Sequence, residues 1–151
     1  MITIFNVGKN SYSLSTAERA ELFRCIEAYR QTANGAWLTA VNYRCFTYMW
    51  KKDLQNSDVQ AIRPLTGSKI YLQPNGSRDK FWVQLIAPAA IHELRHVWQK
   101  KQKGLLSYSF QSVFGRLVYA VNPAKYESCS LEADAFEQQD KATDYIQKHC
   151  Q

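Results

Sequence analysis

The 151-residue sequence lacks several features that mark particular classes of protein. None of its apolar runs approaches the roughly 20 residues that a membrane-spanning helix needs, and its start, MITIFNVGKNSYS, lacks the charged-then-apolar pattern of a secretory signal. Its four cysteines form no C-x-x-C pair of the kind found in zinc ribbons and redox centres. We therefore expect a cytoplasmic protein with no membrane segment and with reduced cysteines.

A strong charge imbalance is also missing. Lys and Arg outnumber Asp and Glu by 19 to 13, a net charge of +6 that suits a solvated surface about as well as a nucleic-acid partner. The sequence has no internal repeat, low-complexity tract or Gly/Ser/Pro-rich linker. With 46% hydrophobic residues, it has enough apolar material for one core, and we predict a single domain over residues 1–151.

A helix is predicted after Ser15, which forms an S-x-x-E capping box with Glu18. Asn34-Gly35 supplies a stop signal. The apolar residues between these signals recur at helical spacing: Leu22, Cys25, Ile26 and Tyr29.

Strands are predicted next, over residues 41–50 (VNYRCFTYMW) and 68–73 (SKIYLQ), because both are rich in aromatic or β-branched residues. ITIF at residues 2–5 has the weak alternation of a short edge strand. Residues 79–87 leave two alternatives open: a last strand before a helix with Pro88 in its first turn, or a helix that starts near Asp79 and bends at Pro88.

The rest of the chain is predicted to be helical. The predicted fold class is therefore α+β, with a small sheet packed on helices. One helix should end at Gly104, after a cluster of lysines. Another should begin with Asn122 as its cap and Pro123 in its first turn. Its inward stripe is predicted to be Leu131, Ala135, Gln138 and Ala142.

Residues 88–103, PAAIHELRHVWQKKQK, contain two of the three histidines of the chain, placed four residues apart. Positions i and i+4 of a helix differ by about 40°, so His92 and His96 project side by side and can both reach one Zn²⁺ at about 2.0–2.1 Å. Glu93 lies about 100° around from His92, beside the metal, where it can act as general base toward a zinc-activated water. H-E-x-x-H is an attested zinc-protease motif; the alternative is three exposed helical residues.

The other residues of this helix have ordinary roles. Ile91, Leu94 and Trp98 can anchor it in the core. Arg95 is predicted to be a solvent-side charge or the partner of a nearby acid.

A catalytic zinc needs a third protein ligand. Three candidate ligands lie in residues 126–136 (YESCSLEADAF): Glu127, Glu132 and Asp134. His149 sits near the C-terminus, where a role in the site is disfavoured. Glu132 is preferred, because the small Ala135 one turn on lets its helix pack closely on the HExxH helix.

These residues resemble a known family. AAIHELRHVWQ followed by NPAKYESCSLEADAFEQ looks like the gluzincin metallopeptidases, in particular the compact minigluzincins, over roughly residues 68–140. The resemblance implies a zincin-like fold, in which a small twisted sheet is backed by helices and an edge strand binds the substrate backbone. It also implies zinc-dependent peptide hydrolysis with His92, His96 and Glu132 as metal ligands and Glu93 as base.

The sequence departs from the family pattern at one position. Larger gluzincins commonly carry an acid four residues beyond the ligand glutamate, which orients a zinc histidine, and Phe136 stands there instead. Family members also usually offer a Tyr or His to the oxyanion. Tyr108, Tyr119 and Tyr126 are available, although core packing is favoured for each.

Two classes of function follow. The first is a zinc metallopeptidase acting on peptide or protein substrates. The second is a basic binding module with a structural or non-catalytic metal and a nucleic-acid or protein partner. YRCFTYMWKK at residues 43–52 favours the second, since aromatics interleaved with Arg and Lys stack on bases, although a half-buried strand explains the same pattern. Glu93 favours the first, because a structural zinc has no use for a base.

Overall fold

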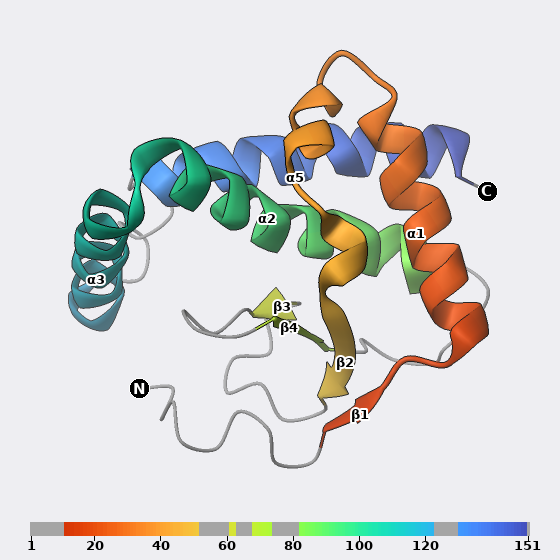
Figure 1. Ribbon diagram of the computed structural model, residues 1–151, viewed down its shortest axis with the longest axis horizontal. Coiled ribbons are helices and arrows are strands. Elements are labelled where there is room, and N and C mark those ends of the chain that lie inside the picture. The colour runs from red at the N-terminus through yellow and green to blue at the C-terminus, as the bar shows by residue number, and fades with distance from the viewer. Residues whose placement is uncertain (1–10, 52–60, 63–67, 74–81, 123–129, 151) are drawn as a thin grey trace.

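The computed structural model describes residues 11–51, 61–62, 68–73, 82–122 and 130–150. Within these ranges the chain is α+β and mostly helical, as Figure 1 shows. Among the residues described, none of the helices combines the length and the apolarity needed to cross a bilayer. The helices are α1 (Thr16–Arg30), α2 (Trp82–Lys103), α3 (Leu105–Val121) and α5 (Ser130–His149).

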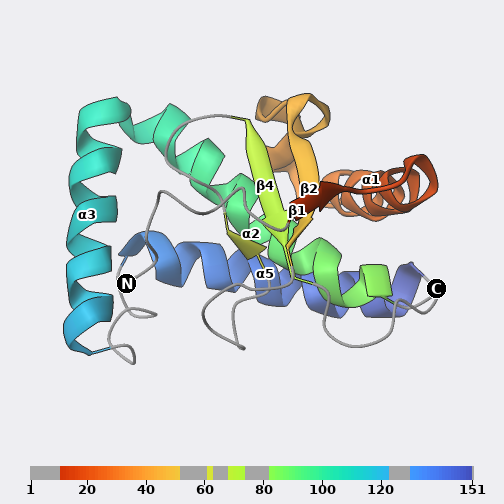
Figure 2. The same ribbon diagram turned by 90° about the horizontal axis from the view of Figure 1, so that it is seen from below.

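A small sheet covers one side of α2. Its strands are β1 (Ser11–Ser13), β2 (Thr47–Lys51), β3 (Ala61–Ile62) and β4 (Lys69–Leu72), in the order β1-β2-β4-β3. β2 and β4 are parallel and the two outer pairings are antiparallel. β3 and β4 lie against α2, which places the edge strand β3 beside this helix (Figure 2).

The register of β2 and β4 builds the core under the helices. Tyr48 pairs with Ile70 and Trp50 with Leu72, so these four side chains share one face of the sheet. All four are at most 2% exposed. The predicted strand over residues 68–73 is thereby confirmed.

The capping box of α1 is confirmed by its two reciprocal hydrogen bonds. The Glu18 backbone N–H donates to Ser15 Oγ at 3.1 Å, and the Ser15 N–H donates to Glu18 Oε1 at 2.9 Å. The predicted apolar stripe of α1 is buried. The helix ends at Arg30, before the predicted stop, and a Cβ at Gly35 would come within 2.0 Å of the Tyr29 carbonyl oxygen, so this close approach requires glycine.

The strand predicted over residues 41–50 is wrong in its first half. The chain forms short 3₁₀ helices at Ala36–Ala40 and Tyr43–Cys45, and β2 begins only at Thr47. The strand prediction depended on Val41, Tyr43 and Cys45 alternating with Asn42 and Arg44. Val41 and Tyr43 are buried, but Cys45 is exposed, so the alternation does not continue through the 3₁₀ turn.

The strand alternative for residues 79–87 is also wrong where the structure describes them. α2 is helical from Trp82 and continues through Pro88, so this proline lies inside the helix. The helical period explains the outcome, because residues at i, i+3, i+4 and i+7 from Val83 face the core: Val83, Ile86, Ala87 and Ala90. Residues 2–5 and Asp79 lie outside the described residues.

The predicted end of α2 is confirmed. Gly104 has a φ of 80°, and its N–H donates to the Lys100 carbonyl oxygen at 3.1 Å. The sequence reasoning did not single out α3, which lies between α2 and the last helix. The predicted inward stripe of α5 is buried. Asn122, the predicted cap, directly follows the end of α3, and Pro123 falls outside the described residues.

Glu27 links α1 to the 3₁₀ turn at Tyr43–Cys45 and gives a prediction about acid stability. Hydrogen bonds from Arg30 and from the Tyr43 hydroxyl lower the pKa of Glu27 to about 2, from an ordinary 4.5. The ionised carboxylate therefore adds stability above the unfolded pKa, and that stability is lost as the pH falls through about 2. Glu27→Gln should lower the free energy of unfolding in urea at pH 7, with a difference from wild type that shrinks toward pH 2.

Glu21→Gln is the matched control, since Glu21 pairs with the exposed Arg24 on the same helix. Its effect should be smaller because an exposed ion pair contributes little. Equal losses in both variants at pH 7 would show that Glu27 does not link the two segments energetically.

Candidate metal centre

The packing of α5 along α2 brings together side chains that are far apart in the sequence. The two helices are in contact and cross one another (Figures 1 and 2). His92 and His96 lie on the face of α2 that meets α5, and Glu132 lies in the first turn of α5. All three are at most 9% exposed, so the exposed-residue alternative for the two histidines is wrong.

The three side chains converge on one point. His92 Nε2 lies 3.2 Å from His96 Nε2 and 3.2 Å from Glu132 Oε2, and His96 Nε2 lies 3.0 Å from Glu132 Oε1. Ligand atoms bound at 2.0–2.1 Å to one tetrahedral ion lie about 3.3 Å apart. The cluster therefore has the spacing of a metal site with three protein ligands, and its ligand atoms all lie within 4.8 Å of one another.

The electrostatics of the cluster also favour a cation. Burial raises the pKa of Glu132, but the two imidazole rings next to its carboxylate outweigh burial and hold that pKa well below its usual range. Burial lowers the pKa of His96, but Glu132 and Glu93 outweigh it and the net pKa is raised. The site therefore stabilises positive charge, which a divalent ion supplies without a proton.

Gln99 fixes the orientation of the His96 ring. The Gln99 amide nitrogen donates to the Leu131 carbonyl oxygen and to Asp134 Oδ2, both at 2.8 Å, which uses both of its hydrogens. Its Oε1 must then accept from His96 Nδ1, at 2.8 Å. The proton of His96 is thereby held on Nδ1, and Nε2 keeps the lone pair that faces the cluster.

Gln99 was not among the residues predicted from the sequence, although its contact with His96 is of the orienting kind that Phe136 cannot make. One signal was available: Gln99 follows His96 by three residues, a spacing that places both on the same face of a helix.

Arg95 and Asp134 support this arrangement from outside the cluster. The Arg95 guanidinium donates to both Asp134 carboxylate oxygens, at 2.7 and 3.0 Å, and lies over the rings of Trp98 and Trp37 at 3.9 and 4.9 Å. Of the two roles predicted for Arg95, the partner of an acid is confirmed. Asp134 is engaged by Arg95 and Gln99, so it is not a ligand, and Trp98 packs partly buried against the core.

His92 is held differently from His96. Its Nδ1 is buried and has no hydrogen-bond partner among the residues that the structure describes. The Phe136 ring packs edge-on against the His92 ring, with centroids 4.6 Å apart. Packing therefore orients His92, whereas hydrogen bonding orients His96.

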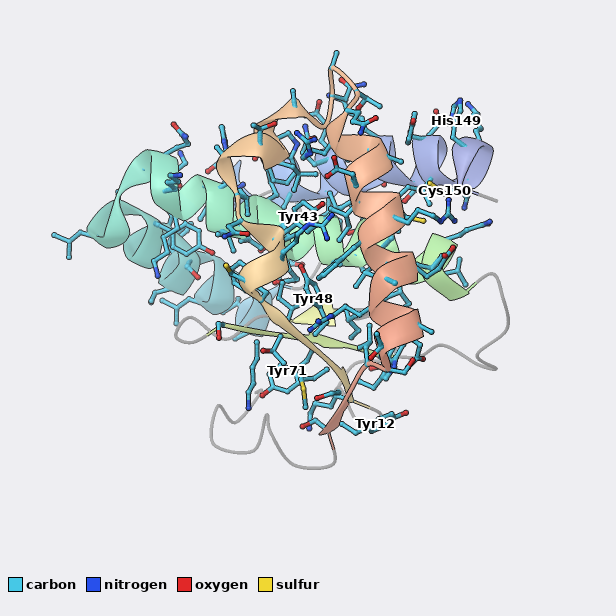
Figure 3. All side chains as sticks on the ribbon, turned by 45° about the vertical axis from the view of Figure 1, so that its right-hand side comes forward. Tyr12, Tyr43, Tyr48, Tyr71, His149 and Cys150 are labelled. Carbon is cyan, nitrogen blue, oxygen red and sulfur yellow. The ribbon has the colours of Figure 1, made fainter. Side chains whose placement is uncertain are left out.

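Of the other residues that the sequence suggested for the site, some lie at the cluster and others lie elsewhere. Glu93 is 9% exposed, and its charge helps to raise the pKa of His96. Tyr108 reaches the site from α3, is buried, and has its ring 6.5 Å from that of His96. His149 instead stacks on Tyr145 at the C-terminal end of α5, next to Cys150 (Figure 3). Glu127 and Tyr126 lie outside the described residues, as does the side chain of Tyr119.

Comparisons of the chain with protein-family models, with curated proteins and with solved structures found no match. The gluzincin resemblance therefore stays a prediction that depends on the motif residues.

Removal of any one ligand should abolish tight metal binding. His92→Ala, His96→Ala and Glu132→Ala each leave two ligands, which hold zinc weakly, so the purified variants should lose zinc at micromolar free metal. Zinc per chain is measured by elemental analysis after dialysis. Glu137→Ala on the exposed side of α5 is the control and should retain the metal of the wild type. Stoichiometric zinc in all three ligand variants would show that the site lies elsewhere.

Gln99→Leu should weaken zinc binding without removing a ligand. The substitution frees the His96 ring to carry its proton on Nε2, and loss of such an orienting partner typically costs about 10–100-fold in metal affinity. Affinity is measured by competition with a fluorescent zinc chelator on folded protein.

Gln138→Leu is the matched control for Gln99→Leu. Gln138 is also a buried glutamine, but it accepts from Tyr29 and Trp37 away from the cluster. It should lower stability while leaving zinc affinity within a few fold. Equal losses of affinity in the two variants would reduce the role of Gln99 to general packing.

Proposed function

We propose that this chain is a zinc metallopeptidase that hydrolyses peptide bonds with Glu93 as general base. The convergence of His92, His96 and Glu132, with Glu93 next to the first ligand, is the observation that carries the proposal. Two imidazole nitrogens and one carboxylate oxygen form a donor set that suits zinc better than magnesium or calcium. Three protein ligands also leave one tetrahedral position for water or substrate.

Each residue has a defined task in this proposal. Bound zinc would polarise the substrate carbonyl and lower the pKa of a water to about 7. Glu93 accepts a proton from the attacking water and passes it to the departing amine. Glu132 and the two histidines hold the metal, and Gln99 keeps the Nε2 lone pair of His96 directed at it.

The arrangement of the sheet supports a peptide as the substrate. β3 is an edge strand against α2, and an edge strand can pair with an extended peptide through main-chain hydrogen bonds. We infer from this edge, from the HExxH helix α2 and from the ligand-bearing helix α5 that the fold is zincin-like.

The binding-module alternative has less support. The aromatic residues of the basic stretch at 43–52 include Tyr43, Tyr48 and Trp50, which are at most 5% exposed and point into the molecule (Figure 3 labels the two tyrosines). These three rings offer no surface on which bases could stack, and the fourth aromatic residue, Phe46, is partly buried against the core. A module with a structural metal and a protein partner remains the second candidate, and Glu93 distinguishes the two experimentally.

Glu93→Gln keeps the size of the side chain and removes its basicity. We expect zinc content and folding to be retained, while cleavage of an unstructured peptide library falls about 100-fold or more. Cleavage is followed by mass spectrometry of the products. Glu137→Gln should cleave as the wild type does.

Undiminished cleavage by Glu93→Gln would refute the catalytic role of this residue. A wild-type protein that holds one zinc per chain and cleaves no member of the library would favour the binding module instead.

A further inference from the structure

An apolar stripe runs along the outer side of α3. Its side chains belong to large hydrophobic residues that are 51–88% exposed. Their positions fall within about 100° of one another on a helical wheel. They span α3 from its first turn to its last residue: Leu106, Val113, Phe114, Leu117 and Val121.

The opposite side of α3 meets the rest of the molecule. Tyr108 lies about 170° from the middle of the stripe and is 4% exposed. Among the α3 side chains that the structure describes, only Tyr108 is buried. Figures 1 and 2 show the helix at one end of the molecule, roughly perpendicular to α2 and α5. The stripe therefore faces away from the metal centre.

The size of the stripe is that of an interface. Its five side chains expose on the order of 700 Å² together, close to the roughly 800 Å² that each partner buries in a standard protein interface. Monomeric proteins usually keep their exposed apolar patches smaller than this. Leu85 on α2, by contrast, is a single exposed leucine of the ordinary kind.

The amino-acid composition of α3 distinguishes between possible partners for the stripe. Its sequence, LLSYSFQSVFGRLVYAV, contains one charged residue, Arg116. A helix that lies on a lipid surface usually carries many lysines and arginines on its polar face, and α3 does not. An uncharged stripe is complementary to a second copy of itself, and closed two-fold dimers are the commonest protein assembly. We propose that the protein forms a homodimer through the outer stripe of α3.

This inference does not depend on the proposed activity. Because Tyr108 and the stripe lie on opposite sides of α3, a second copy on the stripe leaves the metal centre uncovered. Dimerisation would also hold in place the helix that carries Tyr108 to the ring of His96.

Phe114 gives the sharpest test, since it lies near the midpoint of the stripe along α3, where a residue of a two-fold dimer is expected to lie close to its own copy. Sedimentation velocity of the wild type from about 1 to 100 µM should show a dimer. Phe114→Asp and Phe114→Lys should each weaken the dimer at least about 30-fold, as loss of an interface hot spot does. A mixture of the two variants should recover dimer through opposite charges.

Two further variants keep the result interpretable. Leu106→Lys, at a residue that is 87% exposed, cannot disturb the core and should also weaken the dimer. Leu85→Lys should leave it unchanged. Circular dichroism checks that each variant is folded.

Three results would overturn the proposal. The first is a wild type that stays monomeric over this range. The second is a dimer that survives both Phe114→Asp and Leu106→Lys. The third is a monomer that binds vesicles containing phosphatidylserine through the stripe, which would assign this surface to lipid.

Discussion

The packing of α5 along α2 is the contact on which the candidate site depends, because the ligands come from both helices. His92 and His96 belong to α2, and their carboxylate partner Glu132 belongs to α5. Ala135, one turn after Glu132, is fully buried, which allows the two backbones to approach. A shift of one helix along the other by a single turn, about 5.4 Å, would separate Glu132 from both imidazoles.

Polar contacts in the same interface determine this alignment. Arg95 and Gln99 both reach Asp134, and Gln99 also reaches the Leu131 carbonyl, so α2 is tied to the first turn of α5 at several points. Buried polar groups are costly when they lack hydrogen-bond partners. A misaligned helix pair would leave all of these polar groups without partners. The network that aligns the helices is also the one that orients His96, so the fold and the site share the same contacts.

The convergence of His92, His96 and Glu132 was predictable from the sequence because its signals are local. The spacing of His92 and His96 follows from the geometry of one helix, and Glu132 was favoured by the small residue one turn beyond it. The role of Gln99 and the choice of partner for Arg95 were not determined by the sequence, since both depend on how α5 docks. The strand predicted from residue 41 was wrong because β-branched and aromatic residues such as Val41 and Tyr43 are buried by 3₁₀ turns too. The exposed stripe of α3 cannot be distinguished from a core face by periodicity.

We propose that His92, His96 and Glu132 hold one zinc ion. A crystal structure with diffraction data collected on both sides of the zinc absorption edge tests it most directly. We expect one zinc peak per chain, bound by Nε2 of both histidines and by a Glu132 oxygen, with a fourth position open. A map without a peak there, or with the zinc held by Glu127 or His149 instead, would contradict it.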